Sequence, residues 1–287
     1  MSRGSTGRPG ETLDGFSFAG RSGSARHVPT IFDSAQMSET DAEREPQPSE
    51  PYKEARAREP MFNLSSVVVA MIALCCGIHL FRFLFLDEDQ DLGLILRFAF
   101  IPLRYSGGYV IDIYAIVSPL TYSLLHGSAI HLAVNMIWLA AFGSPLALRI
   151  GTLRFLLFWV VTALGAVALH YVLHSTDASP LVGASGSISG MMGAAARFAF
   201  RIDRGSGTPA FAGRILDIGE VFRSRQVVIF LAVWMVVNIV TGIGVGVPGV
   251  ANPIAWEAHI GGFLAGFFLL RLFDRVPDPP LESSGEA

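Results

Sequence analysis

Apolar residues gather into six long runs along this chain, separated by shorter polar stretches. A helix needs roughly 20 mostly apolar residues to cross a bilayer, and each run approaches that length. The pattern therefore predicts an all-α membrane protein, a bundle of six transmembrane helices over residues 61–275. The runs are Phe62–Leu86, Val117–Phe142, Leu153–Leu173, Ser185–Ile202, Val227–Val245 and Ile254–Phe273.

The two ends of the chain are polar. Residues 1–60 are rich in Gly, Ser, Pro, Glu and Arg and lack the periodicity of a helix or a strand. This composition is typical of disorder, so we expect a disordered tail there and a short flexible tail over 276–287. A mitochondrial transit peptide over the first thirty residues is the alternative, since four arginines fall there, although Glu11 and Asp14 count against it.

Basic residues predict the orientation of the bundle. Lys53, Arg56 and Arg58 precede the first run, further arginines follow the second, fourth and sixth, and none follows the third or fifth. Because basic loops stay on the cytoplasmic side, we expect both termini to be cytoplasmic and the first, third and fifth loops to lie outside. The long first loop, from Asp87 to Ile116, is partly apolar. We expect it in the membrane interface, with a poorly inserted extra span as the alternative.

Composition supports a membrane protein and excludes other classes. Hydrophobic residues make up 51% of the chain and the mean hydropathy is +0.48, although the polar tail lowers that average. The remaining body is too apolar for a soluble domain. The two cysteines, Cys75 and Cys76, are neighbours that cannot bridge to each other and complete no metal site. No basic patch with interleaved aromatic residues indicates nucleic-acid binding.

Four polar side chains stand inside these apolar runs. Ser185 begins the fourth run, His259 lies early in the sixth, and His131 and Asn135 are one helical turn apart in the second. Charged groups within a bilayer cost about 2.5–3.5 kcal/mol each, so such residues are candidates for function. We count at a rise of about 1.5 Å per residue to an arginine near the cytoplasmic edge of each run, Arg197, Arg271 and Arg149. Ser185 and His259 then lie roughly 18 Å, and Asn135 about 21 Å, above the inner boundary.

Small residues favour a close approach of the fourth and sixth runs. Gly186 and Gly190 repeat at a spacing of four beside the serine, and Gly262 and Gly266 do the same after the histidine. Such stripes let two helix backbones pack tightly in a membrane, which would bring the hydroxyl towards the imidazole. Ordinary membrane packing is the simpler interpretation of each stripe taken alone.

These side chains fit nucleophilic catalysis. A serine hydroxyl needs a base to remove its proton, and His259 can act as that base and later protonate a leaving amine. We find no buried carboxylate to orient the histidine, because Glu257 points elsewhere on a helix, so a dyad is expected rather than a triad. Pro180 and Gly183 mark a loop that ends just before Ser185, which predicts that the serine begins a helix.

Further groups can stabilise the oxyanion that acyl transfer creates. Free backbone N–H groups at a helix N-terminus favour negative charge. His131 and Asn135 share one helix face and can add side-chain donors. His126 lies off that face, so we expect it to hold the loop entrance structurally. Asn238, in the fifth run, is expected to form an interhelical hydrogen bond.

Taken together, these motifs resemble the rhomboid intramembrane serine proteases over most of residues 61–275. Residues 183–186 match the family's Gly-x-Ser-Gly, residues 126–135 match His-x4-His-x3-Asn, and Ala258-His259 followed by Gly262 and Gly266 match the Ala-His-x2-Gly-x3-Gly pattern. Two positions depart from the pattern. The family's frequent Trp-Arg pair is Val117-Ser118 here, and the aromatic residue four positions after the serine is Ser189.

The resemblance implies a serine endopeptidase with Ser185 as nucleophile and His259 as base. His131, Asn135 and the Ser185 backbone N–H would bind the oxyanion, with no metal or organic cofactor. The partners would be the lipid bilayer and transmembrane protein substrates, cleaved near their outer ends. A bacterial inner membrane is the expected location, with a eukaryotic organelle as the alternative. The sequence does not determine the substrate or the oligomeric state.

Two other functions stay open from the sequence. A non-catalytic relative that binds or escorts transmembrane helices would share the fold, although such proteins usually lack the serine or the histidine. A small-solute channel or transporter also fits six helices, but no inverted repeat or pair of broken helices supports it.

Overall fold

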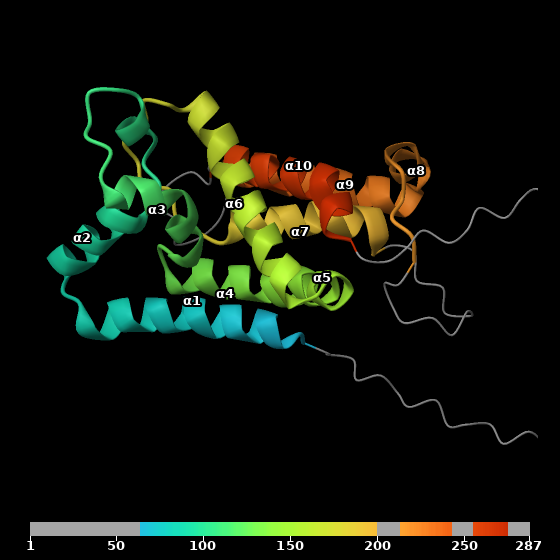
Figure 1. Cartoon of the computed structure of the whole chain (residues 1–287), viewed down its shortest axis with the longest axis horizontal. Coiled ribbons are helices and arrows are strands. Elements are labelled where there is room, and N and C mark those ends of the chain that lie inside the picture. Colours follow the sequence, from blue (N-terminus) through green and yellow to red (C-terminus); the bar gives the residue numbers. More distant parts are fainter. Residues whose placement is uncertain (1–63, 200–212, 243–254, 275–287) are drawn as a thin grey trace, which may run out of the picture. The chain divides into compact units, whose positions relative to one another are not determined.

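The computed structural model describes residues 64–199, 213–242 and 255–274. The predicted tails, 1–60 and 276–287, lie outside these residues. The described chain is helical, with a single isolated bridge between Phe100 and Leu181. Figure 1 shows the elements, which are α1 (Ser66–Phe85), α2 (Glu88–Phe98), η1 (Pro102–Tyr105), α3 (Ile113–Thr121), η2 (Tyr122–Leu124), α4 (Ala129–Trp138), η3 (Leu139–Gly143), α5 (Ser144–Ile150), α6 (Thr152–Leu173), α7 (Ser185–Phe198), α8 (Ile218–Arg223), α9 (Arg225–Gly242) and α10 (Trp256–Phe273).

Three helical segments of the described chain are long and apolar enough to cross a membrane. They are α1, the continuous stretch Ala129–Ile150 formed by α4, η3 and α5, and α6. The other predicted spans correspond to α7, α9 and α10, which do not meet the same criteria of length and hydropathy. Helix α7 has only 14 residues, so it is shorter than the run that predicted it.

The predicted second span was wrong in its limits. Residues 117–121 belong to the separate helix α3, the chain turns over residues 122–128, and the long helix runs on to Ile150. Ser128 caps the new helix by accepting a hydrogen bond from the backbone N–H of His131 at 3.2 Å. Hydrophobicity alone could not reveal this turn, because the residues on both sides of it are apolar.

The first loop is ordered by polar contacts. Helix α2 begins with a capping box formed by Asp87 and Gln90, a common N-terminal signal. The buried guanidinium of Arg82, at the end of α1, binds Asp91 at 2.6 Å and donates to the carbonyl of His126 at 2.8 Å. Arg82 therefore joins α1, α2 and the segment that leads into α4.

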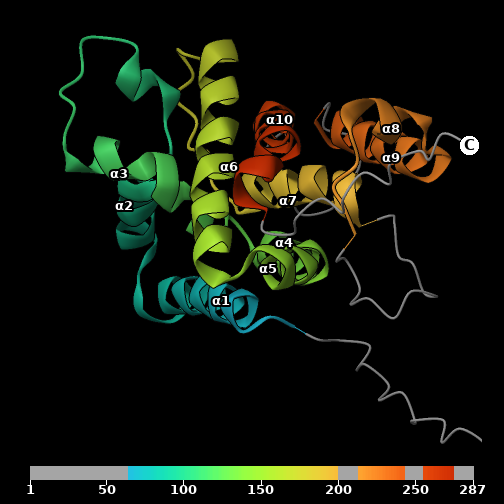
Figure 2. The same cartoon turned by 45° about the vertical axis from the view of Figure 1, so that its right-hand side comes forward.

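Helix α7 lies in the centre of the described helices. Figure 2 shows it between α10 on one side and α4 with α5 on the other. Almost every residue of α7 from Gly186 to Phe198 is buried, whereas α1 exposes many large apolar side chains such as Phe83 and Phe85. This placement explains why the run that forms α7 is less hydrophobic than the run that forms α1. The residues of α7 contact other helices, whereas many side chains of α1 point outward.

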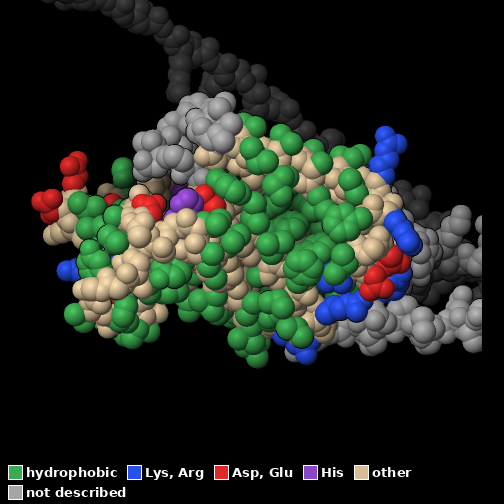
Figure 3. Space-filling view, turned by 90° about the horizontal axis from the view of Figure 1, so that it is seen from above, with side chains coloured by type: hydrophobic (Ala, Val, Ile, Leu, Met, Phe, Trp, Pro, Cys, Tyr) green, Lys and Arg blue, Asp and Glu red, His purple; other side chains and the backbone are tan. Residues whose placement is uncertain are grey.

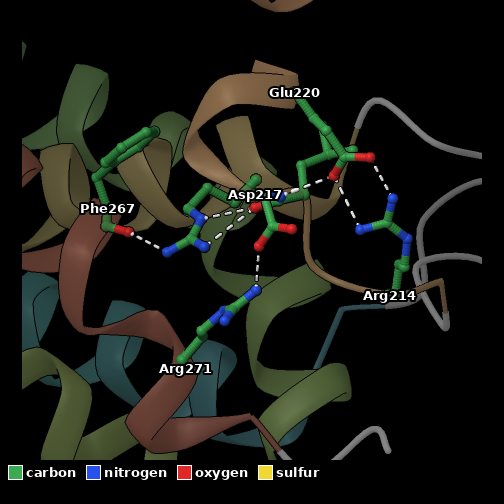
Figure 4. Close-up of polar contacts among 7 residues, drawn as sticks. Arg214, Asp217, Glu220, Phe267 and Arg271 are labelled. Atoms are coloured by element: carbon green, nitrogen blue, oxygen red, sulfur yellow. Dashed lines mark hydrogen bonds and ion pairs between the residues drawn. The ribbon is translucent and has the colours of Figure 1, made fainter. Parts of the chain in front are cut away.

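Arginine side chains hold one end of the bundle together. Arg197 donates to the carbonyl of Leu216 at 3.0 and 3.1 Å and to that of Phe267 at 2.9 Å. Arg271 pairs with Asp217 nearby (Figure 4). Figure 3 shows that hydrophobic side chains cover the middle of one face, whereas Lys and Arg gather towards one end.

Arg149 belongs to the same basic end. It binds Asp274 at 2.9 and 2.7 Å and donates to the carbonyl of Gly213 at 2.7 Å. The three arginines used as depth markers in the sequence, Arg149, Arg197 and Arg271, therefore contact the short stretch 213–217 or the end of α10. The count from Arg197 to Ser185 equals the count from Arg271 to His259, and the Ser185 and His259 side chains are in contact.

Candidate active site

Ser185 is the first residue of α7, as the loop signals before it predicted. The first four N–H groups of a helix lack intrahelical acceptors, so donors surround the start of α7. Gly183, two residues earlier, has φ +127°, a conformation that L side chains rarely adopt. A Cβ atom there would also lie 2.9 Å from the ring atom Nε2 of His131. Glycine thus allows the loop to pass between the nucleophile and that ring.

The Ser185 hydroxyl and the His259 ring meet although 74 positions separate them in the sequence. The distance between Ser185 Oγ and His259 Nε2 is 2.8 Å, within the range of a good hydrogen bond. Both residues are half-buried, so the pair is accessible from one side. Such a contact between a hydroxyl and an imidazole is the geometry that a nucleophile and its general base require.

Asn238 of α9 holds the other nitrogen of His259. Its Oδ1 lies 2.6 Å from His259 Nδ1, while its Nδ2 donates to the carbonyl of Trp234 at 2.8 Å. The bond to Trp234 fixes the amide so that its oxygen faces the ring. An amide oxygen only accepts, so Nδ1 carries the proton and Nε2 presents a lone pair to Ser185. This tautomer allows the ring to remove the serine proton.

The sequence predicted an interhelical hydrogen bond for Asn238 but not that its partner is the candidate base. The only indication in the sequence was a single amide side chain within an apolar run. Such a residue does not identify the helix that it faces. Glu257, as expected, does not orient the ring, because its carboxylate binds His174 at 2.7 Å. Within the described residues no aromatic ring stacks on His259, in keeping with Ser189 at the position of the motif's aromatic residue. The hydrogen bond to Asn238 is the contact that supports the ring.

His131 and Asn135 lie on α4, and the His131 ring faces the loop that leads to the nucleophile. Gly183 lies between the His131 ring and Ser185, since a Cβ on that glycine would meet atoms of both. Asn135 is buried and donates one amide N–H to the carbonyl of His131 at 2.9 Å. Its second N–H leaves a donor for a further acceptor.

His126 lies before α4, outside the helix that carries His131. Its ring is buried and packs edge-on against that of His131, with the centroids 5.3 Å apart. Its carbonyl accepts the hydrogen bond from Arg82. These contacts place His126 behind the His131 ring, where it supports the entrance to α4.

The small residues of α7 and α10 face each other. A Cβ on Gly262 would overlap the carbonyl oxygen of Gly186, and one on Gly266 would overlap that of Gly190. Helix α10 packs most extensively against α7 and then α6. The close approach inferred from the glycine spacing is therefore present, and it sets the distance between Ser185 and His259.

A helical membrane protein with a half-buried serine–histidine pair is the class that this fold and site define. The family model of the Rhomboid domain matches residues 115–275, more than half of the chain. The chain belongs to the rhomboid family, whose members are multi-pass membrane proteins and include both serine proteases and inactive homologues.

Three plant proteins show the same relationship. RHOMBOID-like protein 5 of Arabidopsis thaliana is 30% identical over 146 residues, which cover 50% of this chain and 40% of that protein. RHOMBOID-like protein 4 is 30% identical over 145 residues, covering 50% and 31%. RHOMBOID-like protein 6, mitochondrial, is 28% identical over 146 residues, covering 50% and 39%. The matched region thus covers less than half of each relative.

Removal of the Asn238 amide is expected to slow catalysis without preventing folding. Asn238→Leu keeps a similar volume but leaves His259 Nδ1 without its acceptor, so the ring loses its tautomer and orientation. Loss of a group that orients a metal-bound histidine typically costs about 10–100-fold, and we expect a loss of the same order here. We expect kcat of purified protein on a transmembrane substrate to fall by that factor with KM nearly unchanged.

Asn238→Asp is the matched control, because it keeps an acceptor oxygen at the same position and should retain more activity than Asn238→Leu. A Leu variant with wild-type kcat would show that Asn238 has only a packing role. Equal thermal unfolding of the two variants would exclude a general loss of structure as the cause.

Proposed function

We propose that this chain is an intramembrane serine endopeptidase that cleaves transmembrane segments through an acyl-enzyme. The observation that carries this proposal is the 2.8 Å contact between Ser185 Oγ and His259 Nε2, with Asn238 holding the ring in the tautomer that accepts a proton. Family membership alone does not decide activity, because inactive homologues share the fold.

The reaction follows from the atoms present. Ser185 Oγ attacks the carbonyl carbon of the scissile peptide bond while its proton passes to His259 Nε2. The tetrahedral intermediate collapses, the C–N bond breaks, and the leaving amine takes the proton from the ring. Water then gives a proton to the same nitrogen and attacks the ester carbon. The C–Oγ bond breaks, Ser185 Oγ takes the proton back from His259 Nε2, and the acid is released.

Donors for the oxyanion surround the nucleophile. The backbone N–H groups at the start of α7, the His131 ring and the second amide N–H of Asn135 are the groups we assign to it. Loss of one such donor typically costs about 2.7–4 kcal/mol of transition-state stabilisation. No step of this scheme calls for a metal ion or an organic cofactor.

For the membrane topology, we propose six crossings with both termini on the cytoplasmic side. The basic end, around Arg197, Arg214 and Arg271, would face the cytoplasm. Ser185 and His259 lie near the N-terminal ends of α7 and α10, whereas Arg197 and Arg271 lie near the C-terminal ends. Cleavage would therefore occur towards the outer face. We propose a bacterial cell membrane as the location. The name of one relative contains "mitochondrial", so an organelle membrane is the alternative.

The second candidate function is capture of transmembrane helices without cleavage. It is favoured only by the existence of inactive homologues in the family, while the assembled Ser185–His259 pair counts against it. Stable binding of a substrate helix without any product would support this alternative.

Product analysis tests the proposed function directly. Purified full-length protein in liposomes, given a panel of single-helix substrates with helix-breaking residues at different depths, should yield two fragments each. We expect mass spectrometry to place the cuts in the outer part of the substrate helix, because the serine lies at that end of α7. Intact substrates throughout the panel, or cuts at the cytoplasmic end, would contradict the proposal.

A further inference from the structure

A second cluster of chemistry-bearing side chains lies apart from the serine. His170 lies in the last turn of α6, and His174, four positions later, is the residue that caps the C-terminus of that helix. Glu257, the second residue of α10, reaches the same place from the neighbouring helix. The candidate ligand atoms of these three residues all lie within 4.8 Å of one another.

The distances in the cluster lie on either side of the distance between two ligands of a small cation. His174 Nε2 lies 2.7 Å from Glu257 Oε1, and His170 Nδ1 lies 4.0 Å from Glu257 Oε2. Zinc binds nitrogen and oxygen at about 2.0–2.2 Å in tetrahedral sites, which places two ligands about 3.3 Å apart. The observed distances bracket that value, so small rotations of the side chains would centre an ion.

His170 supplies an independent indication of a ligand. The side chain is more than nine-tenths buried, and its Nδ1 atom has no hydrogen-bond partner. A buried polar atom without a partner costs about 1–3 kcal/mol, so proteins rarely leave one. The atom faces the Glu257 carboxylate at a distance too long for a hydrogen bond, and a cation between the two would satisfy both.

The surrounding charges favour a cation as well. The last turn of α6 carries the negative end of the helix dipole. Asp177 lies just beyond it, where hydrogen bonding from the backbone N–H of Ser179, together with smaller effects of the two histidines, lowers the pKa of its carboxyl below the usual range. Glu257 and Asp177 together balance the charge of a divalent ion.

We propose that His170, His174 and Glu257 form a binding site for a divalent transition metal ion of the zinc type. Two imidazoles and one carboxylate are a common ligand set for zinc, and a water molecule would complete a tetrahedron. The ion would fasten the end of α6 to the first turn of α10, two residues before His259. Its role is structural or regulatory, and it takes no part in the serine chemistry.

Cobalt titration of the purified full-length chain tests this site. The experiment uses the Ser185→Ala protein, stripped with a chelator and free of a histidine tag, so it does not depend on protease activity. We expect one equivalent of Co²⁺ to produce the visible absorption of a tetrahedral ion, without the charge-transfer band that the thiolates of Cys75 or Cys76 would add. One equivalent of Zn²⁺ should remove that absorption.

The double variant His170→Gln, His174→Gln should lower the affinity for Co²⁺ by about 100-fold or more, because two of three ligands are lost. His79→Gln is the control, since that histidine also carries a buried unpartnered Nδ1 but lies outside the cluster. It should bind like the parent. Zn²⁺ should also raise the melting temperature of the parent and not that of the double variant.

Two outcomes would overturn the proposal. The first is no saturable binding by the parent protein. The second is equal affinity in the parent and the double variant, which would assign the ion to other histidines, such as His126 and His131. In either case the contact between His174 and Glu257 would be only a hydrogen bond that fastens α6 to α10.

Discussion

Replacement of Ser185 by alanine is expected to abolish proteolysis while the fold remains. The hydroxyl is the only atom lost, and the remaining Cβ keeps the start of α7 in place. Without the nucleophile neither the acyl-enzyme nor its hydrolysis can occur. Removal of the nucleophile from a serine protease lowers kcat by about 10⁴-fold or more, so product should fall below detection in a liposome assay.

Two measurements check this result. A fluorophosphonate probe should label wild-type protein at Ser185 and leave the alanine variant unlabelled, because within the described residues the Ser185 hydroxyl is the one that His259 Nε2 contacts. Ser187→Ala is the matched control, since the Ser187 hydroxyl points away and donates to the carbonyl of Trp159 at 3.2 Å. Cleavage and labelling at wild-type levels in Ser185→Ala would reject the proposed mechanism.

Gly262→Val is expected to be nearly as damaging, for a reason of packing. The new Cβ would overlap the carbonyl oxygen of Gly186 and lie 2.7 Å from its carbonyl carbon. These are backbone atoms in the middle of a helix–helix contact, so they cannot move as a side-chain end can. Overpacking typically costs about 1–3 kcal/mol, and here it also moves α10 away from α7. The Ser185–His259 hydrogen bond would then be lost.

The comparison with Gly77→Val isolates this effect. Gly77 lies on α1 where an added Cβ meets nothing within 4 Å, so that variant should keep wild-type activity and melting temperature. For Gly262→Val we expect a lower melting temperature in detergent, at least 100-fold less product and weak probe labelling. A Gly262→Val protein that matches the Gly77 variant in all three measurements would show that the contact of α7 with α10 does not position the dyad.

Much of the candidate site was visible in the sequence, because polar groups in an apolar run are conspicuous. Ser185, His259, His131 and Asn135 could each be selected on the cost of burying polar groups in lipid. The glycine spacing showed which two helices approach, and the structure places Gly262 against Gly186 as expected. The catalytic roles of these residues stay predictions until the serine variant is measured.

The partner of His259 was not visible in the same way. A hydrogen bond between α9 and α10 depends on the rotation of each helix about its axis, and nearly uniform hydrophobicity leaves that rotation undetermined. Asn238 was therefore predicted to bond across helices without a named partner. For the same reason, no pattern in the sequence indicated that His170 and His174 lie beside Glu257.

The sequence by itself determined that this is an all-α membrane protein, which polar residues are candidates for chemistry, and which helix faces are small enough to meet. A polar residue in an apolar run is costly to bury, and a glycine lets two helices approach closely. Each can therefore be recognised in the sequence at a single position. Only the tertiary structure decided where the chain turns between α3 and α4, which atom orients the His259 ring, and how α6 meets α10. These depend on the distances and rotations between segments far apart in the chain, and no local pattern of residues records them.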